Sequence, residues 1–248
     1  MTEEQHVLPF SNSNLPDFVL KKCADELHET PESKEKGLQE LIENIKGNSK
    51  TYGIEFEKDF LIHYLKVNKY YVQKSLRQIQ NYIELWKKEG FLFKSLPDEY
   101  FITEGSTRFA ALLPERCPEG CPVFLFQIGK WDPNEMEFTD ILKLIALIHL
   151  QLLRDPMTQI NGIKTIYDFK GTSFQHLRNI LSDKLYLINH IPTVHFHSNP
   201  IRLRKYFPTS MLPVGYGGEI RDINSQVWIR RMNNEQEKFS VGGQPNFY

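Results

Sequence analysis

The segment Ile141–Leu153 limits most strongly how this chain can fold. It is apolar almost all round a helix and contains only three polar residues. Such a helix must be covered on most of its sides, and it is shorter than the roughly 20 residues that a membrane span needs. We expect a buried helix that is capped by Thr139 or Asp140, ends near Arg154 and lies inside a layered domain.

Two strand patterns flank this helix. Val123–Ile128 is a short apolar run, and Ile163–Phe169 follows the turn pair Asn161-Gly162. A strand, a helix and a strand in this order predict a parallel strand pair with a right-handed crossover. Leu185–Ile188 and Val194–Phe196 are two further strand candidates.

The pattern before residue 90 is helical, since apolar residues recur at spacings of three and four from Asp17 to about Glu89. Thr30-Pro31-Glu32 is a typical helix start, because threonine can cap and proline suits the first turn. Three amphipathic helices are marked by Leu38, Leu41, Ile42 and Ile45, by Phe60, Leu61, Tyr64 and Leu65, and by Val72, Leu76, Ile79, Tyr82 and Ile83.

These patterns predict the α/β class in three parts. Residues 12–105 form a helical N-terminal lobe, a small bundle, and residues 106–218 form an α/β lobe with a mainly parallel sheet. Residues 219–248 are a C-terminal tail, loose from Met232 onward because this stretch is rich in Asn, Gln and Gly. The stretch from about Lys94 to Gly120 is expected to be a loop.

Composition and net charge exclude some classes of binding partner for this chain. The chain is 40% hydrophobic and 25% charged, which is ordinary for a soluble globular protein. Its net charge of −1 excludes a wholesale polyanion binder, so we expect no nucleic acid partner. Basic residues exceed acidic ones in residues 159–248, where any anionic partner should bind. Three cysteines and an N-terminus without a basic and then apolar leader predict a cytoplasmic protein.

Six segments together resemble the CRAL-TRIO lipid-transfer family, in the family's order. They are Glu26–Glu32 (ELHETPE), Phe60–Leu76 (FLIHYLKVNKYYVQKSL), Ile128–Pro133 (IGKWDP), Thr158–Ile163 (TQINGI), Tyr167–Gly171 (YDFKG) and Leu212–Gly218 (LPVGYGG). Each segment is weakly specific alone, and the set is jointly specific.

The resemblance implies a helical N-terminal lobe and an α/β lobe that encloses an apolar cavity. It implies binding and intracellular transfer of one small lipophilic molecule, similar to a tocopherol, a retinoid or a phospholipid. Delivery would occur at an anionic membrane surface with phosphoinositide contact, so the protein would be cytoplasmic and peripherally membrane-associated. The resemblance implies no catalysis and no cofactor, so we expect no enzyme.

The chain departs from the family between Gly171 and Gly215. Leu185–Pro192 resembles the family's central strand and runs almost directly into Val194–His197, which resembles the next strand. The family's gate helix and its basic phosphoinositide contacts have no counterpart in this shortened stretch. The departure predicts a poorly closed lipid lobe and weak phosphoinositide specificity.

The candidate ligand-binding residues lie on the apolar helix and the strand after it. Leu142, Ile145 and His149 share one helix face, and they match positions that line the family's cavity, as do Ile163 and Tyr167. A lipid with one polar end needs apolar area and one hydrogen-bonding group. His149 is the candidate for that group, and the alternative is a core histidine bonded to protein groups.

Arg202, Arg204 and Lys205 belong to the densest cluster of basic residues in the chain. They are candidates for contact with anionic lipid headgroups, where a well-placed cation contributes about 1 kcal/mol. The alternative is an ordinary solvated helix face.

Other candidate chemistry is weaker. His190, His195 and His197 alternate along a strand candidate, but no acidic residue or cysteine completes a zinc site. Cys117 and Cys121 span an expected hairpin turn bent at Glu119-Gly120, for which an ordinary turn is favoured over a zinc or redox role. We therefore expect no metal and no catalytic residue.

The sequence thus favours a lipid-binding or lipid-transfer protein. The alternative, from a different class, is a shortened family member that carries nothing and acts as an interaction module through its helical lobe. A histidine-dependent hydrolase ranks third.

Overall fold

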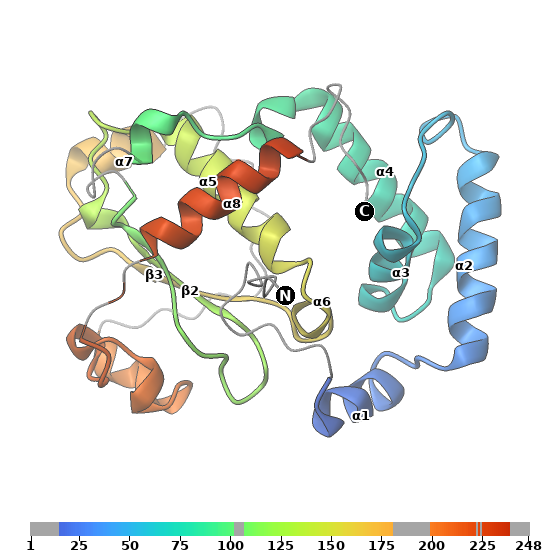
Figure 1. Cartoon of the computed structure of the whole chain (residues 1–248), viewed down its shortest axis with the longest axis horizontal. Coiled ribbons are helices and arrows are strands. Elements are labelled where there is room, and N and C mark those ends of the chain that lie inside the picture. The colour runs from blue at the N-terminus through green and yellow to red at the C-terminus, as the bar shows by residue number, and fades with distance from the viewer. Residues whose placement is uncertain (1–14, 102–106, 181–198, 222, 224, 239–248) are drawn as a thin grey trace, which may run out of the picture.

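The structure is a computed structural model that describes residues 15–101, 107–180, 199–221, 223 and 225–238. It is a mixed helix and sheet protein in which a group of helices from the first ninety residues lies beside an α/β part (Figure 1). The predicted α/β class is confirmed.

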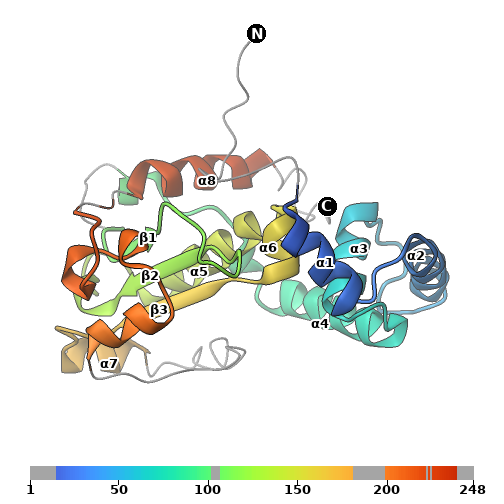
Figure 2. The same ribbon diagram turned by 90° about the horizontal axis from the view of Figure 1, so that it is seen from below.

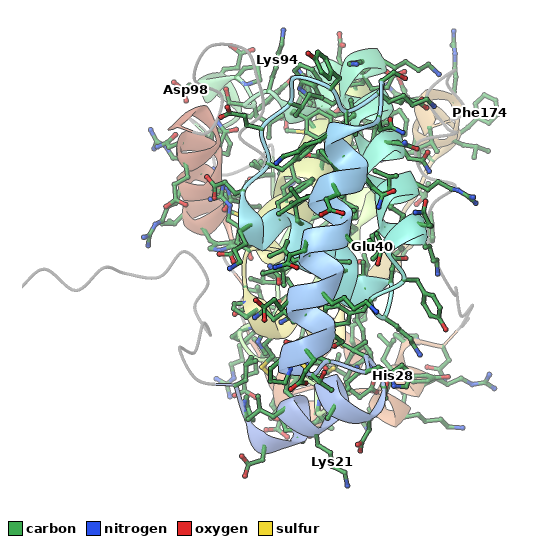
Figure 3. The ribbon with its side chains drawn as sticks, turned by 90° about the vertical axis from the view of Figure 1, so that its right-hand side faces the viewer. Lys21, His28, Glu40, Lys94, Asp98 and Phe174 are labelled. Atoms are coloured by element: carbon green, nitrogen blue, oxygen red, sulfur yellow. The ribbon has the colours of Figure 1, made fainter. Side chains whose placement is uncertain are left out.

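The N-terminal helices follow the apolar periodicity of the sequence. They are α1 (Asp17–Asp25), α2 (Pro31–Lys46), α3 (Lys58–Val67) and α4 (Val72–Lys88). Helix α2 begins as predicted at a Thr30 cap, where the backbone N–H of Ser33 donates to Thr30 Oγ1 and Ser33 Oγ accepts from the backbone N–H of Thr30. Leu41 and Leu65 are fully buried between α2, α3 and α4, and Ile79 joins them. Figure 3 shows α2 on the outside of this group, with Glu40 on its surface.

The sheet contains three strands in the order β1-β2-β3. Strand β2 (Val123–Gln127) pairs in parallel with β3 (Lys164–Asp168), which confirms the predicted crossover, and pairs in antiparallel fashion with β1 (Ala110–Leu112). Strand β1 was not predicted, because it lies in the stretch expected to be a loop. The apolar run around it is short, and only its pairing with β2 makes it a strand.

Helix α5 (Phe138–Leu152) connects β2 and β3 and has no exposed residue along its length. The predicted caps are wrong. The N-cap is Glu137, without a side-chain cap bond, and Thr139 and Asp140 lie within the first turn. The Asp140 carboxylate instead accepts from Tyr100 Oη at 2.7 Å and from Lys143 Nζ at 2.7 Å, so it ties neighbouring side chains together.

A second helix, α6 (Pro156–Asn161), was also missed by the periodicity, since it is only six residues long. Its N-cap is Asp155, whose carboxylate accepts from the backbone N–H of Thr158 at 2.7 Å and from Arg116 Nη2 at 2.6 Å. Helix α6 contacts both α1 and α3, so it joins the N-terminal helices to the α/β part.

The two faces of the sheet are covered by different parts of the chain. Helices α5 and α8 (Gln226–Lys238) lie over one face, and the short 3-10 helices η5 (Pro200–Lys205), η6 (Thr209–Met211) and η7 (Val214–Tyr216) lie over the other (Figure 1). Viewed from below, α8 forms one edge of the molecule and α7 (Phe174–Ile180) lies near the opposite edge (Figure 2). Further short helices are η1 (Gly90–Phe93), η2 (Asp98–Phe101) and η3 (Ile128–Lys130).

The expectation of a loose tail from Met232 onward is wrong for residues 232–238, which belong to α8. Ile229 and Met232 have no exposed surface and belong to the same core as α5. Asn233 is buried and forms two hydrogen bonds with the backbone of Leu96, accepting from its N–H at 2.6 Å and donating to its C=O at 2.9 Å. Although this stretch is mainly polar, Ile229 and Met232 form a narrow apolar stripe on the face of α8 that packs against the core.

Several predictions fall on residues that the structure does not describe. The strand candidates Leu185–Ile188 and Val194–Phe196 and the histidines at 190, 195 and 197 lie in residues 181–198. The absence of a gate helix therefore stays a prediction.

The Asn233 contact predicts that α8 is required for stability. Asn233→Ala leaves the N–H and C=O of Leu96 buried without their partners, which should lower the free energy of unfolding by about 2–4 kcal/mol. Urea denaturation measures this change. The matched control is Asn234→Ala, one residue on and exposed, which should change stability by less than about 0.5 kcal/mol. Equal changes in the free energy of unfolding for the two substitutions would contradict the role of the Asn233–Leu96 hydrogen bonds in holding α8.

His63 on α3 predicts how stability depends on pH. Burial and then the charge of Lys66 lower the pKa of His63 from its ordinary 6.5 to about 4. Its Nδ1 is buried without a hydrogen-bond partner in the structure. Below pH 6.5 the unfolded chain binds a proton that the folded chain does not bind, so stability falls as the pH falls. The loss should approach about 3 kcal/mol near pH 4.

Urea denaturation between pH 7.5 and pH 4 tests this dependence, because this range spans the pKa of His63 in the unfolded and in the folded chain. His63→Phe keeps a ring beside Tyr64 and removes the titrating group, so its curve should be flatter. His28→Asn, at an exposed histidine, should leave the wild-type dependence unchanged. A His63→Phe curve parallel to that of the wild type would show that His63 is not the group responsible.

Candidate functional site

The candidate site lies on the face of the sheet that α5 covers. Alternate residues of a strand point to opposite faces, so Phe124 and Phe126 of β2 face α5, and Val123 and Leu125 face the 3-10 helices. Phe126 is paired with Tyr167 across the parallel ladder, and their rings stack with centroids 5.6 Å apart and planes 10° apart. Tyr167 is thereby fixed on the α5 side.

Four of the five predicted ligand-binding residues come together on this face. Leu142 belongs to the core cluster between α5 and the sheet, and Ile145, Ile163 and Tyr167 pack against that cluster as partly buried residues. Leu142 is almost fully buried, whereas Ile145 and His149 retain some exposure. We call Leu142, Ile145, His149, Ile163 and Tyr167 the α5–β3 wall.

His149 has one ring nitrogen bonded and one without an assigned partner. Nδ1 lies 2.7 Å from the carbonyl oxygen of Ile145, and a carbonyl only accepts, so Nδ1 carries the proton and donates. Burial lowers the pKa of His149, which keeps the ring neutral. In that tautomer Nε2 is a hydrogen-bond acceptor. Within the described ranges no hydrogen bond to Nε2 is found.

Gln151 is a second buried polar group on α5, and the sequence reasoning passed over it. Its side chain is almost fully buried, and neither atom of its amide has a hydrogen-bond partner in the structure. Buried amides are normally paired. Because it is two residues beyond His149, it points from a different face of α5. Its position as a polar break in an apolar helix was the available signal.

The opposite face of the sheet carries a polar anchor. Tyr216 Oη donates to Asp168 Oδ2 at 2.5 Å and accepts from Gln127 Nε2 at 2.9 Å. Asp168 and Gln127 are the paired last residues of β3 and β2. The following Gly217 has a φ of +79°, a left-handed backbone conformation that favours glycine at this turn. This anchor holds η5, η6 and η7 against the sheet.

The basic residues predicted to meet anionic lipid lie on η5. Arg202, Arg204 and Lys205 are all exposed. Arg204 Nε donates to the carbonyl oxygen of Gly217 at 2.8 Å, so this arginine also supports the fold. Ile201 and Tyr206 flank the three cations and are 54% and 41% exposed, which places apolar surface among the charges.

A second exposed apolar group lies at α7 and was not predicted. Phe169, Phe174 and Leu177 are 58%, 80% and 47% exposed. Lys170 and Arg178, also exposed, accompany them. Figure 3 shows Phe174 at the periphery of the molecule. The sequence signal for this exposed apolar group was the presence of Phe169 and Phe174 at the two ends of the polar segment Lys170–Ser173.

Two surface hollows lie elsewhere. One of about 610 Å³ is bordered by Trp131 and His176, and one of about 590 Å³ by Tyr70 and Lys74. Neither is lined by the α5–β3 wall. In the first, His176 accepts from the backbone N–H of Ser173 at 3.0 Å through Nδ1, and its Nε2 donates to the carbonyl oxygen of Trp131 at 2.8 Å, so the ring fastens α7.

Among the described residues, no cluster of three or more His, Cys, Asp and Glu side chains is arranged to hold a metal ion. No helix in those same ranges is long and apolar enough to cross a membrane. Cys117 and Cys121 form the predicted hairpin turn between β1 and β2, in which the N–H of Gly120 donates to the carbonyl oxygen of Cys117 at 2.7 Å.

Comparison with known proteins identifies relatives of this chain. Residues 107–193 match the family model of the CRAL/TRIO domain. The chain is 22% identical over 253 residues to alpha-tocopherol transfer protein-like of Homo sapiens, an alignment that covers 87% of this chain and 74% of the relative. It is 26% identical over 162 residues to clavesin-1 of Rattus norvegicus, covering 64% of this chain and 46% of the relative.

Proposed function

Because residues 107–193 match the CRAL/TRIO domain, we propose that this chain binds a small lipophilic molecule and transfers it at membrane surfaces. The name of one relative, alpha-tocopherol transfer protein-like, refers to transfer of alpha-tocopherol. The function proposed here is carriage of a ligand of that general kind, without catalysis.

The observation that carries the proposal is the α5–β3 wall. Its residues share one face, and four of the five are apolar. Ile145, Ile163 and Tyr167 are only partly buried, although they pack against a fully buried core. A bound apolar molecule would remove this remaining surface from water, at about 25 cal/mol for each Å².

His149 gives the proposed ligand a preferred polar end. Since Nδ1 donates to Ile145, Nε2 offers an acceptor beside the wall. An acceptor pairs with a hydroxyl group and repels a phosphate or carboxylate oxygen. We therefore favour a lipophilic alcohol or phenol, such as a tocopherol or a retinoid alcohol, over a phospholipid bound through its phosphate.

Membrane association is the second part of the proposal. It is supported by the cations of η5 with Ile201 and Tyr206 on either side of them, and by Phe169 before α7 and Phe174 on α7, with Lys170 and Arg178. Apolar side chains mixed with cations suit the interface of an anionic bilayer. The attraction is proposed to be mainly non-specific, with weak selectivity among phosphoinositides.

Ile145→Asp tests ligand binding. It places an unpaired carboxylate on the wall, where desolvation of the charge costs several kcal/mol, so lipid that co-purifies with the protein should be lost. Organic extraction and mass spectrometry of purified protein measure the bound lipid. Val227→Asp is the matched control, because Val227 is 76% exposed on α8, and it should retain the wild-type amount.

Two further variants make the result decisive. Ile145→Trp fills the space without a charge, so loss of lipid in this variant too shows that occupancy depends on the wall. His149→Phe should bind a lipophilic alcohol and its methyl ether equally, whereas the wild type should prefer the alcohol. Wild-type lipid content in folded Ile145→Asp and Ile145→Trp would refute the proposed site. A wild-type chain without any extractable lipid would favour the interaction-module alternative.

Neutralising η5 tests the membrane contact. The double variant Arg202→Gln/Lys205→Gln should lose about 2 kcal/mol of attraction to phosphatidylserine vesicles, roughly 30-fold in partitioning. Arg204 is left in place because it supports the Gly217 turn. Vesicle sedimentation measures the bound fraction, and binding by the wild type should fall as added salt shortens the Debye length from about 8 Å to about 3 Å.

The control for this experiment is Lys36→Gln/Lys46→Gln, which removes the same charge from exposed positions on α2. It should bind vesicles as the wild type does. Equal loss in both double variants would mean that net charge alone governs binding. Strong preference for one phosphoinositide isomer that persists at high salt would contradict non-specific attraction.

A further inference from the structure

The turn between β1 and β2 brings two thiols together. The backbone N–H of Cys117 donates to the carbonyl oxygen of Cys121 at 2.9 Å, so the two residues face each other across the hairpin. Paired positions of this kind have the Cα separation that a disulfide requires. Both cysteines are free and buried, and their side chains belong to the same core cluster.

The two thiols differ in their surroundings. The Cys121 thiol donates to the backbone carbonyl oxygen of Asn161 at 3.2 Å, so Cys121 keeps its proton. The neighbouring Cys121 side chain and the backbone N–H groups of Cys121 and Glu119 outweigh the effect of burial and hold the pKa of Cys117 below its ordinary value. The neighbouring Cys117 side chain, together with burial, raises the pKa of Cys121. The turn therefore pairs a more acidic thiol at Cys117 with a proton-bearing thiol at Cys121.

The surroundings keep this turn in one conformation. Gly120 has a φ of +81°, and a Cβ at this position would lie 2.5 Å from both Asn161 Nδ2 and Met157 Cε of α6. Lys164 Nζ pairs with Glu119 at 2.7 Å, which also keeps a positive charge near the sulfurs. The fold thus holds the two cysteines opposite each other across the turn.

We propose that Cys117 and Cys121 form a redox modification site, in which a hydroperoxide oxidises the pair to a disulfide. An ordinary turn, which the spacing alone favours, needs neither cysteine. A reactive dithiol requires a thiol of lowered pKa, a resolving thiol beside it and a fixed geometry. The turn supplies all three.

The chemistry balances in two steps. The Cys117 thiolate attacks one oxygen of the hydroperoxide, the O–O bond breaks, and Cys117 becomes a sulfenic acid while the leaving oxygen takes up a proton as water or an alcohol. Cys121 sulfur then attacks Cys117 sulfur, the S–OH bond breaks, and the thiol proton of Cys121 leaves with the hydroxyl as water. The pair loses two electrons and the hydroperoxide gains them.

Oxidation also has a structural consequence. Cys121 Sγ donates to the carbonyl oxygen of Asn161 at 3.2 Å, and Asn161 Oδ1 accepts from Lys22 Nζ of α1 at 3.1 Å. The disulfide has no thiol proton, so the first of these bonds is lost. We expect hydrogen exchange to increase in α6 and α1 of the oxidised protein.

The experiment uses the reduced full chain with hydrogen peroxide at neutral pH. Trypsin releases both cysteines in the single peptide Cys117–Lys130, so an internal disulfide appears as the loss of two hydrogen atoms from that peptide. Oxidation of this peptide should be at least about tenfold faster than oxidation of Cys23, whose pKa is raised by burial. Hydrogen-exchange mass spectrometry measures the exchange of backbone amides in α6 and α1 in the same samples.

Serine variants assign the roles of the two sulfurs. Cys121→Ser should accumulate a sulfenic acid at Cys117 that dimedone traps, Cys117→Ser should leave Cys121 unmodified, and the control Cys23→Ser should form the disulfide at the wild-type rate. Oxidation of all three cysteines at one rate, a disulfide between Cys23 and the 117–130 peptide, intermolecular dimers, or zinc retained by the pair would overturn the proposal. Unchanged exchange in the fully oxidised protein would overturn the link to α6.

Discussion

The contact between β2 and α5 is the constraint on which the rest of this structure depends. Residues Val123–Phe126 are almost wholly buried on both faces of the sheet, and α5 has no exposed residue. A strand and a helix with these properties cannot remain in water, so every other part of the α/β lobe acts as cover. Helix α8 and η1 cover α5 on one side, and η5, η6 and η7 cover the sheet on the other.

The covering segments are held in place by a few buried polar contacts. Asn233 joins α8 to the backbone of Leu96, and Tyr216 joins the 3-10 segment to Asp168. Apolar burial has little directional preference, whereas these hydrogen bonds have defined geometry. They therefore select one placement for segments whose apolar surface is small. At the α5–β3 wall, cover by the described residues is incomplete, since Ile145, Ile163 and Tyr167 are only partly buried.

Much of this arrangement could be predicted from the sequence. The N-terminal helices α2, α3 and α4, the Thr30 cap and the parallel strand pair follow from apolar spacing and cap chemistry over short stretches of chain. The grouping of Ile145, Ile163 and Tyr167 also follows, because helix and strand periods determine which residues share a face. Their assignment as a lipid site rests on the family resemblance and on the surface they retain. The caps of α5 were mispredicted because Asp140 instead bonds Tyr100, forty residues before it in the chain.

The sequence by itself determined which segments are helices and strands wherever the apolar period is long enough, and which of their faces must be buried. Only the tertiary structure decided what covers those faces. Strand β1 exists through its pairing with β2, α8 through a narrow apolar stripe against α5, and the proton on His149 through the carbonyl of Ile145. The fixed geometry of the turn from Cys117 to Cys121 could likewise not be read from their spacing, because the turn is held by α6, some forty residues further along the chain. Local patterning acts over one or two turns of chain, whereas these features depend on atoms that only folding brings within bonding distance.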